Sequence, residues 1–342
     1  MYYVGLDVHW SMSVMCILNS DGKLVKSVTV RGPWPKVIES LKGIKGPMAI
    51  CYEASCGYGH LYDQLRQIAQ RVVVAHPGQL RLIFRSKKKN DRVDAKKLAT
   101  LLFLDQVPQV YVPSVDVRSW RSMIEFRHRL VAKRTRVKNG LRSLLRGHGI
   151  EHPADKRLWT RKGVTWLGQV GFPTDIDAIQ RDMKLEELSL LEKQIKRVEQ
   201  ELNAVAGKHP GVWLLRTIPG VGPRTAEAMM AYIDDARRFS KNKKIGSYFG
   251  LVPCEDTSVK KRFGHITQQG PGTVRRLLAE AAWQGYRRSP HIRAYFERIQ
   301  RGDPERKKIA LVATAHYLAR VMLAMLGSGE CWRFDKPQKE AA

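Results

Sequence analysis

The sequence is poor in cysteine and in acidic residues, and both shortages exclude classes of protein. Its five cysteines are odd in number and form no CxxC pair, so neither a disulfide framework nor a zinc site is favoured. The chain has 342 residues, with 60 Lys and Arg against 32 Asp and Glu, which gives a formal net charge of +28. This excess of positive charge predicts a polyanionic partner, with nucleic acid ahead of an anionic membrane.

Long apolar runs are also scarce. No stretch of about 18 apolar residues appears, so we expect no membrane partner. The first residues have the pattern of a strand and not that of a signal peptide, and we expect a cytoplasmic protein. A hydrophobic content of 43% still allows sizeable cores, and the length suits two or three domains.

The N-terminal third predicts an α/β domain. Strands are expected over residues 2–8, 14–18, 24–30, 47–53 and 71–75, and helices over 33–41, 60–69 and 93–104. Three strands followed by alternating helices and strands is the RNase H-like (RuvC-like) order, in which the first strand is central and the fourth lies beside it. In the last helix, Val93, Leu98, Leu101 and Leu102 are expected on the buried side.

Four acidic residues fall where such a fold would gather them. Asp7 lies near the end of the first strand and Glu53 ends the fourth, while Asp91 and Asp94 are three apart on one helix face. Oxygen ligands favour Mg²⁺, and two such ions could stabilise the attacking and leaving oxygens of a phosphodiester. Two alternatives stay open: each acid could be solvated surface charge, and Asp91 could be a helix N-cap.

Residues 118–146 predict a long basic amphipathic helix. It contains ten Lys or Arg and one acid, Glu125, so mutual repulsion favours a bound polyanion over a solvated face. The expected phosphate contacts are Arg127, Lys133, Arg134, Arg136 and Lys138. Residues 182–205 carry apolar side chains every three or four positions, which predicts a coiled-coil hairpin arm.

Residues 211–330 predict a second, mainly helical domain. The segment Ile218-Pro219-Gly220-Val221-Gly222 has the pattern of a helix-hairpin-helix element, in which Gly220 and Gly222 let the backbone approach a phosphate. An ordinary tight turn between helices is the alternative.

Residues 253–272 are rich in turn formers and polar groups. Ser258 stands beside Lys260, Lys261 and Arg262, cations that could hold a phosphodiester against its hydroxyl. A serine without a base or metal is a poor nucleophile, so composition alone favours a loop residue. Thr273 is expected to cap the helix that follows, over 273–286.

Five motifs in order resemble one family. They are GLDVH, CYEAS, NDRVDAKKLA, IPGVGPRTA and the run from GLVPCEDTS through GHITQQGPGTVRRLL. Over nearly the whole chain they resemble the DEDD transposases of insertion-sequence family 110, the bridge-RNA-guided recombinases. The resemblance implies a RuvC-like N-terminal domain whose DEDD acids (Asp7, Glu53, Asp91 and Asp94) hold Mg²⁺. It also implies a C-terminal transposase domain whose serine forms a phosphoserine link with DNA.

In the family this serine closely follows the GLxP element, which points to Ser258 here. Relatives often have Gly after the serine, where this chain has Val259, and Thr257 is the nearest other hydroxyl. The resemblance further implies donor and target DNA, a noncoding guide (bridge) RNA, and a homodimer or homotetramer with active sites composed from different protomers.

The expected organisation follows from these segments. It comprises a RuvC-like domain over 1–150 that ends in the basic helix, a linker and coiled-coil arm over 151–207, a transposase domain over 208–330 and a tail over 331–342. We expect an RNA-guided transposase that needs no ATP, since the sequence has no GxxxxGK[ST] loop and the phosphoserine bond conserves energy for rejoining. A metal-dependent junction nuclease without a covalent intermediate and a non-catalytic nucleic-acid scaffold are the alternatives.

Overall fold

The computed structural model describes residues 1–55, 57–83, 90–153, 157–256 and 262–334. The chain forms two compact units, Met1–Arg118 and Ser119–Ala342. The boundary between them lies inside one helix, α5 (Val115–Gly147). The expected domain boundary at residue 150 lies three residues beyond the end of this helix and differs from the division between the compact units.

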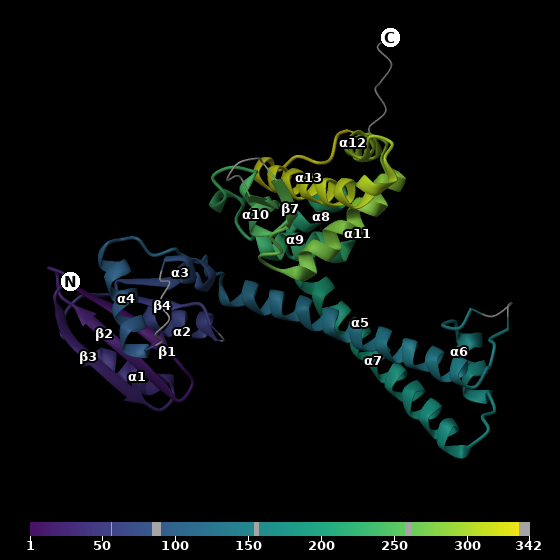
Figure 1. Cartoon of the computed structure of the whole chain (residues 1–342), viewed down its shortest axis with the longest axis horizontal. Coiled ribbons are helices and arrows are strands. Elements are labelled where there is room, and N and C mark those ends of the chain that lie inside the picture. Colours follow the sequence, from purple (N-terminus) through teal and green to yellow (C-terminus); the bar gives the residue numbers. More distant parts are fainter. Residues whose placement is uncertain (56, 84–89, 154–156, 257–261, 335–342) are drawn as a thin grey trace, which may run out of the picture. The chain divides into compact units, whose positions relative to one another are not determined.

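A five-stranded sheet is the centre of the first unit (Figure 1). Its strands are β1 (Tyr2–Val8), β2 (Met12–Leu18), β3 (Leu24–Arg31), β4 (Met48–Glu53) and β5 (Arg71–Ala75), in the order β3-β2-β1-β4-β5. β1 pairs antiparallel with β2 and parallel with β4, so β1 is the central strand and β4 lies beside it, as predicted. The mixed α/β character of this unit is thus confirmed.

Helices cover both faces of the sheet. α1 (Trp34–Lys42) and α2 (Tyr58–Leu65) pack on one face, where Leu41 and Leu61 join Leu6 in a buried cluster. α3 (Pro77–Ile83) and α4 (Asp91–Phe103) cover the other face. The sequence prediction does not contain α3, because its Pro-Gly start resembles a turn.

Gly5 brings α4 directly onto the central strand. A Cβ on Gly5 would overlap the carbonyl oxygen of Ala95 and the amide of Ala99, so helix backbone lies against strand backbone. Both alanines are fully buried. The expectation that Val93 faces the core is wrong, since its side chain is 44% exposed. The small residues make the closest contact with the sheet, and this turns Val93 outward.

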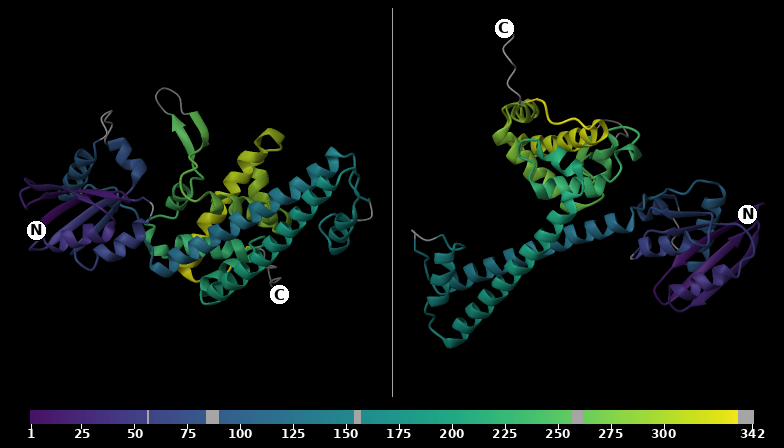
Figure 2. Two further views of the ribbon diagram at one scale, coloured as in Figure 1. Left: turned by 90° about the horizontal axis from the view of Figure 1, so that it is seen from below. Right: turned by 180° about the vertical axis from the view of Figure 1, so that it is seen from behind.

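Two long helices form an arm in the second unit. α5 and α7 (Asp175–Gly207) lie side by side and run in opposite directions (Figures 1 and 2). Their apolar stripes merge in one core, with Leu130 and Leu141 of α5 packed among the α7 residues Leu188, Leu191, Ile195, Val198 and Leu202. At the end of the arm, α6 (Arg161–Gln169) packs its Leu167 on Leu145. The sequence predicted a helix over 118–146 and another over 182–205 but not their mutual contact, and the α6 segment was expected to be irregular.

The rest of the second unit is mainly helical, as expected. Its helices are α8 (Pro210–Arg216), α9 (Pro223–Ile233), α10 (Lys244–Tyr248), α11 (Gly272–Arg288), α12 (Pro290–Gln300) and α13 (Lys307–Ser328). A hairpin of β6 (Pro253–Asp256) and β7 (Arg262–Ile266) precedes α11.

The expected N-cap of α11 is wrong. Pro271 occupies the cap position, and Thr273 lies inside the helix, where its hydroxyl donates to Glu125 Oε2 of α5 at 2.8 Å. The Thr273 side chain thus links α11 to α5 and does not accept a hydrogen bond from a free backbone amide at the start of α11.

α13 contains a long apolar stretch that the sequence analysis did not recognise. In the part of the chain that the structure describes, Pro304–Ser328 is the one segment long and apolar enough to cross a membrane, with a mean hydropathy of 1.7. Its Leu318, Met322 and Leu323 are buried against the neighbouring helices. The helix is therefore a core helix of the second unit.

Candidate active site and nucleic-acid contacts

Three side chains converge at the end of β1. The ligand atoms of Asp7, His9 and Asp91 all lie within 4.8 Å of one another. His9 Nε2 is 3.5 Å from Asp7 Oδ1. Asp91 arrives from the first turn of α4, which the contact at Gly5 holds against β1. Residues 84 positions apart in the sequence thus form one group because a glycine lets the helix approach the strand.

Glu53 belongs to the neighbouring strand at the same level. Leu6 pairs with Tyr52 in the parallel register, so Asp7 and Glu53 are the next residues of their strands. Glu53 is exposed and lies outside the group of three. Asp94 also lies outside it, and its Oδ1 accepts a hydrogen bond from Lys97 Nζ at 3.1 Å.

The electrostatics of Asp7 show that all four acids are close. Burial raises the pKa of Asp7 above its ordinary value, and the charges of Asp91, Asp94 and Glu53 raise it further. The nearby His9 opposes these effects. A carboxylate in such surroundings resists ionisation until a positive charge joins it. The acids therefore form one electrostatic cluster.

Asn90, and not Asp91, caps α4. The Asn90 side chain accepts a hydrogen bond from the Arg92 amide at 3.0 Å, and its backbone is extended as a cap residue requires. The alternative reading of Asp91 as a cap is therefore wrong. The Asp91 carboxylate takes part in the acidic cluster instead.

His9 is a site residue that the sequence analysis missed. It follows Asp7 by two positions at the end of a strand, and side chains two apart in a strand share one face. That spacing in GLDVH was the available signal. An imidazole within reach of two carboxylates can donate a hydrogen bond to one of them or act as a ligand beside them.

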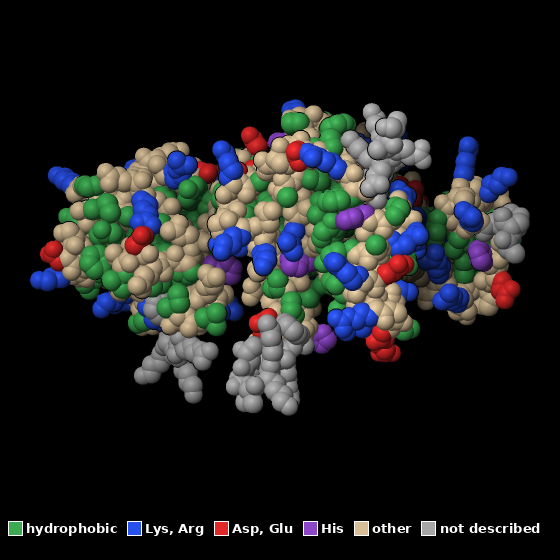
Figure 3. Space-filling view, turned by 90° about the horizontal axis from the view of Figure 1, so that it is seen from above, with side chains coloured by type: hydrophobic (Ala, Val, Ile, Leu, Met, Phe, Trp, Pro, Cys, Tyr) green, Lys and Arg blue, Asp and Glu red, His purple; other side chains and the backbone are tan. Residues whose placement is uncertain are grey.

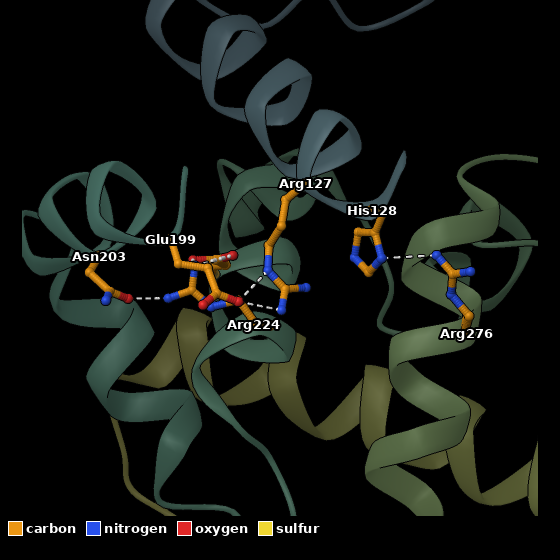
Figure 4. A network of polar contacts seen from close by, with 7 residues as sticks. Arg127, His128, Glu199, Asn203, Arg224 and Arg276 are labelled. Carbon is orange, nitrogen blue, oxygen red and sulfur yellow. Dashed lines mark hydrogen bonds and ion pairs between the residues drawn. The ribbon is translucent and has the colours of Figure 1, made fainter. Parts of the chain in front are cut away.

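Two of the expected phosphate contacts are engaged within the protein. Arg127 Nε donates to Glu199 Oε1 at 2.8 Å, and Figure 4 shows this pair between α5 and α7. Lys138 Nζ lies 3.5 Å from Glu192 Oε1 and 5.0 Å from the centroid of the Trp159 ring. These cations hold the two helices of the arm together.

The other expected contacts on α5 are unpaired. Lys133 and Arg136 are exposed, Arg134 is half-buried, and none of the three forms an ion pair with another described residue. In Figure 3, Lys and Arg side chains outnumber Asp and Glu side chains over the visible face. A surface of this kind attracts phosphate through long-range electrostatics.

The two hairpin glycines have different surroundings. Gly220 has φ +90°, and a Cβ there would overlap the backbone of Gln284 and Gly285 in α11. Its lack of a side chain therefore serves internal packing. Gly222 precedes α9, and a Cβ there would meet no atom within 4 Å, so this side of the glycine is open. Pro223, the first residue of α9, has no amide hydrogen, and the Thr225 amide donates to the carbonyl oxygen of Gly222 at 3.1 Å.

The expected nucleophile lies outside the described residues. Ser258, Lys260 and Lys261 fall between β6 and β7, and so does Thr257. For Arg262 the structure gives the position at the start of β7 and nothing of its side chain.

Two transposase family models match the chain. The DEDD-type IS110 transposase model matches residues 4–150, and the Transposase IS116/IS110/IS902 family matches residues 213–297. The first match contains all four acids, and the second contains the hairpin glycines and the segment with Ser258.

Curated relatives agree with these matches over most of their length. A protein of Sinorhizobium fredii named as transposase y4qE is 30% identical over 332 residues. The match covers 93% of this chain and 80% of the relative. A protein of Pseudomonas aeruginosa named as a family 20 transposase is 28% identical, with 84% and 86% covered. The transposase for insertion sequence element IS1111A of Coxiella burnetii is 26% identical, with 82% and 76% covered. The chain therefore belongs to the IS110 family of insertion-sequence transposases, which act on DNA.

Proposed function

We propose that this transposase cuts and rejoins DNA through a phosphoserine intermediate, with a divalent metal, Mg²⁺, at the acidic cluster. The observation that carries the proposal is the convergence of Asp7 and Asp91 from separate elements, with the charges of Glu53 and Asp94 reaching Asp7. Carboxylates gathered on a chain of net charge +28 would repel phosphate unless a cation lay between them.

The residues present fit such an ion. Four carboxylates offer the hard oxygen ligands that Mg²⁺ prefers, and the raised pKa of Asp7 is an electrostatic strain that a cation would relieve. Asp7 and Asp91 would hold the ion, with Glu53 and Asp94 beside them. Bound there, Mg²⁺ would stabilise the negative charge that develops on phosphate oxygens during cleavage.

The chain's own residues would divide the remaining work. The Ser258 Oγ would give up its proton and bond to phosphorus while the bond from phosphorus to a deoxyribose oxygen breaks. That oxygen would take up one proton and leave as a hydroxyl, so the step consumes no net proton. Lys260, Lys261 and Arg262 would bind the phosphate. Rejoining would reverse the step with a new deoxyribose hydroxyl, which conserves the bond energy without ATP.

Nucleic acid would lie along unpaired cations. Of the five predicted α5 contacts, Lys133, Arg134 and Arg136 form no ion pair with another described residue, whereas Arg127 and Lys138 are engaged by α7 carboxylates. Gly222 and the Arg224 amide in the first turn of α9 would contact a further phosphate. Family resemblance supports a noncoding guide RNA and a homodimer or homotetramer as partners in this reaction.

Covalent trapping tests the mechanism. Wild type and Ser258→Ala would be incubated with Mg²⁺, RNA transcribed from the flanks of the element and labelled junction DNA, and then denatured. We expect label on wild-type protein and none on Ser258→Ala, with Thr257→Val as the control for the neighbouring hydroxyl. Cleavage by Ser258→Ala without any adduct would instead support a metal-dependent nuclease.

A further inference from the structure

An aromatic groove opens in the first unit on the face of the sheet that α1 and α2 cover. Trp10, in the turn between β1 and β2, is 76% exposed. Its ring centroid lies 5.6 Å from that of Trp34, and the ring planes meet at 71°, so the two indoles form adjoining walls. The groove has a volume of about 610 Å³, and Ile38, Lys42 and His60 also line it.

Trp34 connects the groove to both strands that carry the acids. Its Nε1 donates to the carbonyl oxygen of His9 at 3.2 Å, in the turn that follows Asp7. On the other side, a Cβ on Gly57 would overlap the Trp34 ring, so the ring packs directly on the loop that follows Glu53. Gly57 has φ +77°, a conformation that suits glycine. Trp34 thus contacts the backbone at the ends of β1 and β4, while the groove opens on the face of the sheet that α1 and α2 cover and Asp7, two residues after Gly5, lies on the α4 face.

The backbone holds the turn that presents Trp10. The His9 amide donates to the carbonyl oxygen of Met12 at 3.1 Å, and the Gly32 amide donates to that of Ser11 at 2.8 Å. The large exposed indole is thus a property of a hydrogen-bonded turn and not of a loose end. An apolar ring kept in water at a fixed position is available to a partner with an apolar face.

We propose that this groove binds an unpaired base of the DNA strand that is cut. Every base has a π-face that can stack on an indole, whatever its sequence. In a duplex both faces are covered by neighbouring pairs, so the groove accepts a base that has left the stack. Its volume is in the range of sites for small planar ligands, and its lining contains Lys42, a cation for an adjoining phosphate, together with one acid, Glu39.

The inference rests on the proposed function, which supplies the strand that is cut, but base binding can be measured separately. The full chain would carry Asp7→Asn, so that no cleavage disturbs the equilibrium. Affinity for single-stranded DNA containing 2-aminopurine would be followed by fluorescence and compared with affinity for duplex DNA of the same length. The variants are Trp10→Ala, Trp10→Phe and, as a matched control, Trp213→Ala, which removes an indole that is 66% exposed in the second unit.

We expect Trp10→Ala to weaken single-strand binding about tenfold, in line with the loss of one base–aromatic stack. Trp10→Phe should restore most of the affinity, Trp213→Ala should match the parent protein, and duplex binding should change little. Circular dichroism of each variant verifies the fold.

Three results would overturn the inference. One is an equal loss of duplex and single-strand binding, or no loss at all. A second is tighter binding of RNA of the same sequence with the same dependence on Trp10, which would assign the groove to RNA. A third is a change of mass in solution on Trp10→Ala, which would make the groove an interface between copies. Retained cleavage by Asp7→Asn would refute the catalytic proposal alone and leave the binding comparison intact.

Discussion

Asp7 is in an unfavourable position for a charged side chain. Burial and three neighbouring carboxylates raise its pKa, and the described structure places one imidazole, that of His9, against it. Like charges held together destabilise a fold until a cation or a proton joins them. The cluster should therefore couple stability to metal binding.

Replacement of Asp7 tests this coupling. In EDTA, Asp7→Asn should melt at the same temperature as wild type or higher, because the substitution removes repulsion. With Mg²⁺ at 100 times its Kd, wild type should gain about 2.7 kcal/mol and the variant much less. Calorimetry with and without Mg²⁺ measures both effects. An identical Mg²⁺-induced shift in the two proteins would exclude Asp7 as a ligand.

Glu227 is a second buried acid, and it pairs with Arg224, which Figure 4 shows in a network with Asn203. Its side chain is 1% exposed, and burial raises its pKa to about 7 despite the ion pair with Arg224. In the same network burial lowers the pKa of His128 to about 4, and the positive charges of Arg276 and Arg127 add to this shift. The two groups have opposite effects on the pH dependence of stability.

The direction in which each group changes stability with pH depends on whether the folded or the unfolded chain binds its proton. Between pH 4.5 and 7 the folded chain keeps a proton on Glu227 that the unfolded chain has released, so stability falls as pH rises. Between pH 4 and 6.5 the unfolded chain binds a proton on His128 that the folded chain lacks, so stability rises with pH. In wild type these effects largely cancel where the windows overlap.

Glu227→Gln separates the two effects. The variant should gain stability relative to wild type as pH rises from 4.5 to 7, by up to about 3 kcal/mol, and the difference should stay constant above pH 7. Urea unfolding at several pH values measures this difference. A difference independent of pH would show that Glu227 titrates normally in the folded protein.

At the scale of elements, contact between α4 and β1 assembles the acidic cluster. The contact is backbone on backbone, since Gly5 has no side chain and Ala95 and Ala99 have small ones. Overpacking such a contact typically costs about 1–3 kcal/mol. Because Asp91 belongs to the same helix, the displacement would also separate the ligands.

Gly5→Ala should therefore lower both stability and metal response. We expect a loss of at least about 1–3 kcal/mol in urea unfolding and a smaller Mg²⁺-induced shift in melting temperature. Gly43→Ala is the matched control in the same unit, because Gly43 has φ −69° and a Cβ there meets nothing closer than 3.4 Å. Equal effects of the two substitutions would contradict the close contact.

The sequence could predict the sheet because local patterns determine it. Alternating apolar residues, a hairpin turn at Asp21-Gly22 and an apolar fourth strand lead to the observed order, and the bounds of β1 and β5 agree residue for residue. It could not predict His9, the outward position of Val93 or the partners of Arg127 and Lys138. Each of these depends on which surface a distant element covers, and periodicity carries no such information.

At the scale of the whole molecule, the net charge of +28 determines how nucleic acid is approached, but the fold decides which cations remain free. Arg127 and Lys138 are paired with carboxylates of α7, whereas Lys133 and Arg136 are exposed. The double variant Lys133→Ala/Arg136→Ala should therefore reduce the slope of log K against log [salt] for duplex DNA by about 2.

The matched control keeps the charge, as Lys133→Arg/Arg136→Lys. Fluorescence titrations of labelled duplex DNA with each protein, between about 50 and 200 mM salt, measure the slope, and this control should retain the wild-type value. If the charge-free variant kept the wild-type slope too, the phosphates would lie elsewhere on the protein.

The packing of the hairpin against α11 also has an evolutionary consequence. A Cβ added to Gly285 would lie 3.3 Å from the carbonyl oxygen of Pro219 and 2.8 Å from the side chain of Ile292 on α12. An alanine at position 285 would require a smaller side chain at position 292. At position 220 no such compensating substitution exists, because its φ of +90° and the α11 backbone both exclude a side chain. Among relatives we therefore expect glycine to be invariant at position 220, and positions 285 and 292 to change only together.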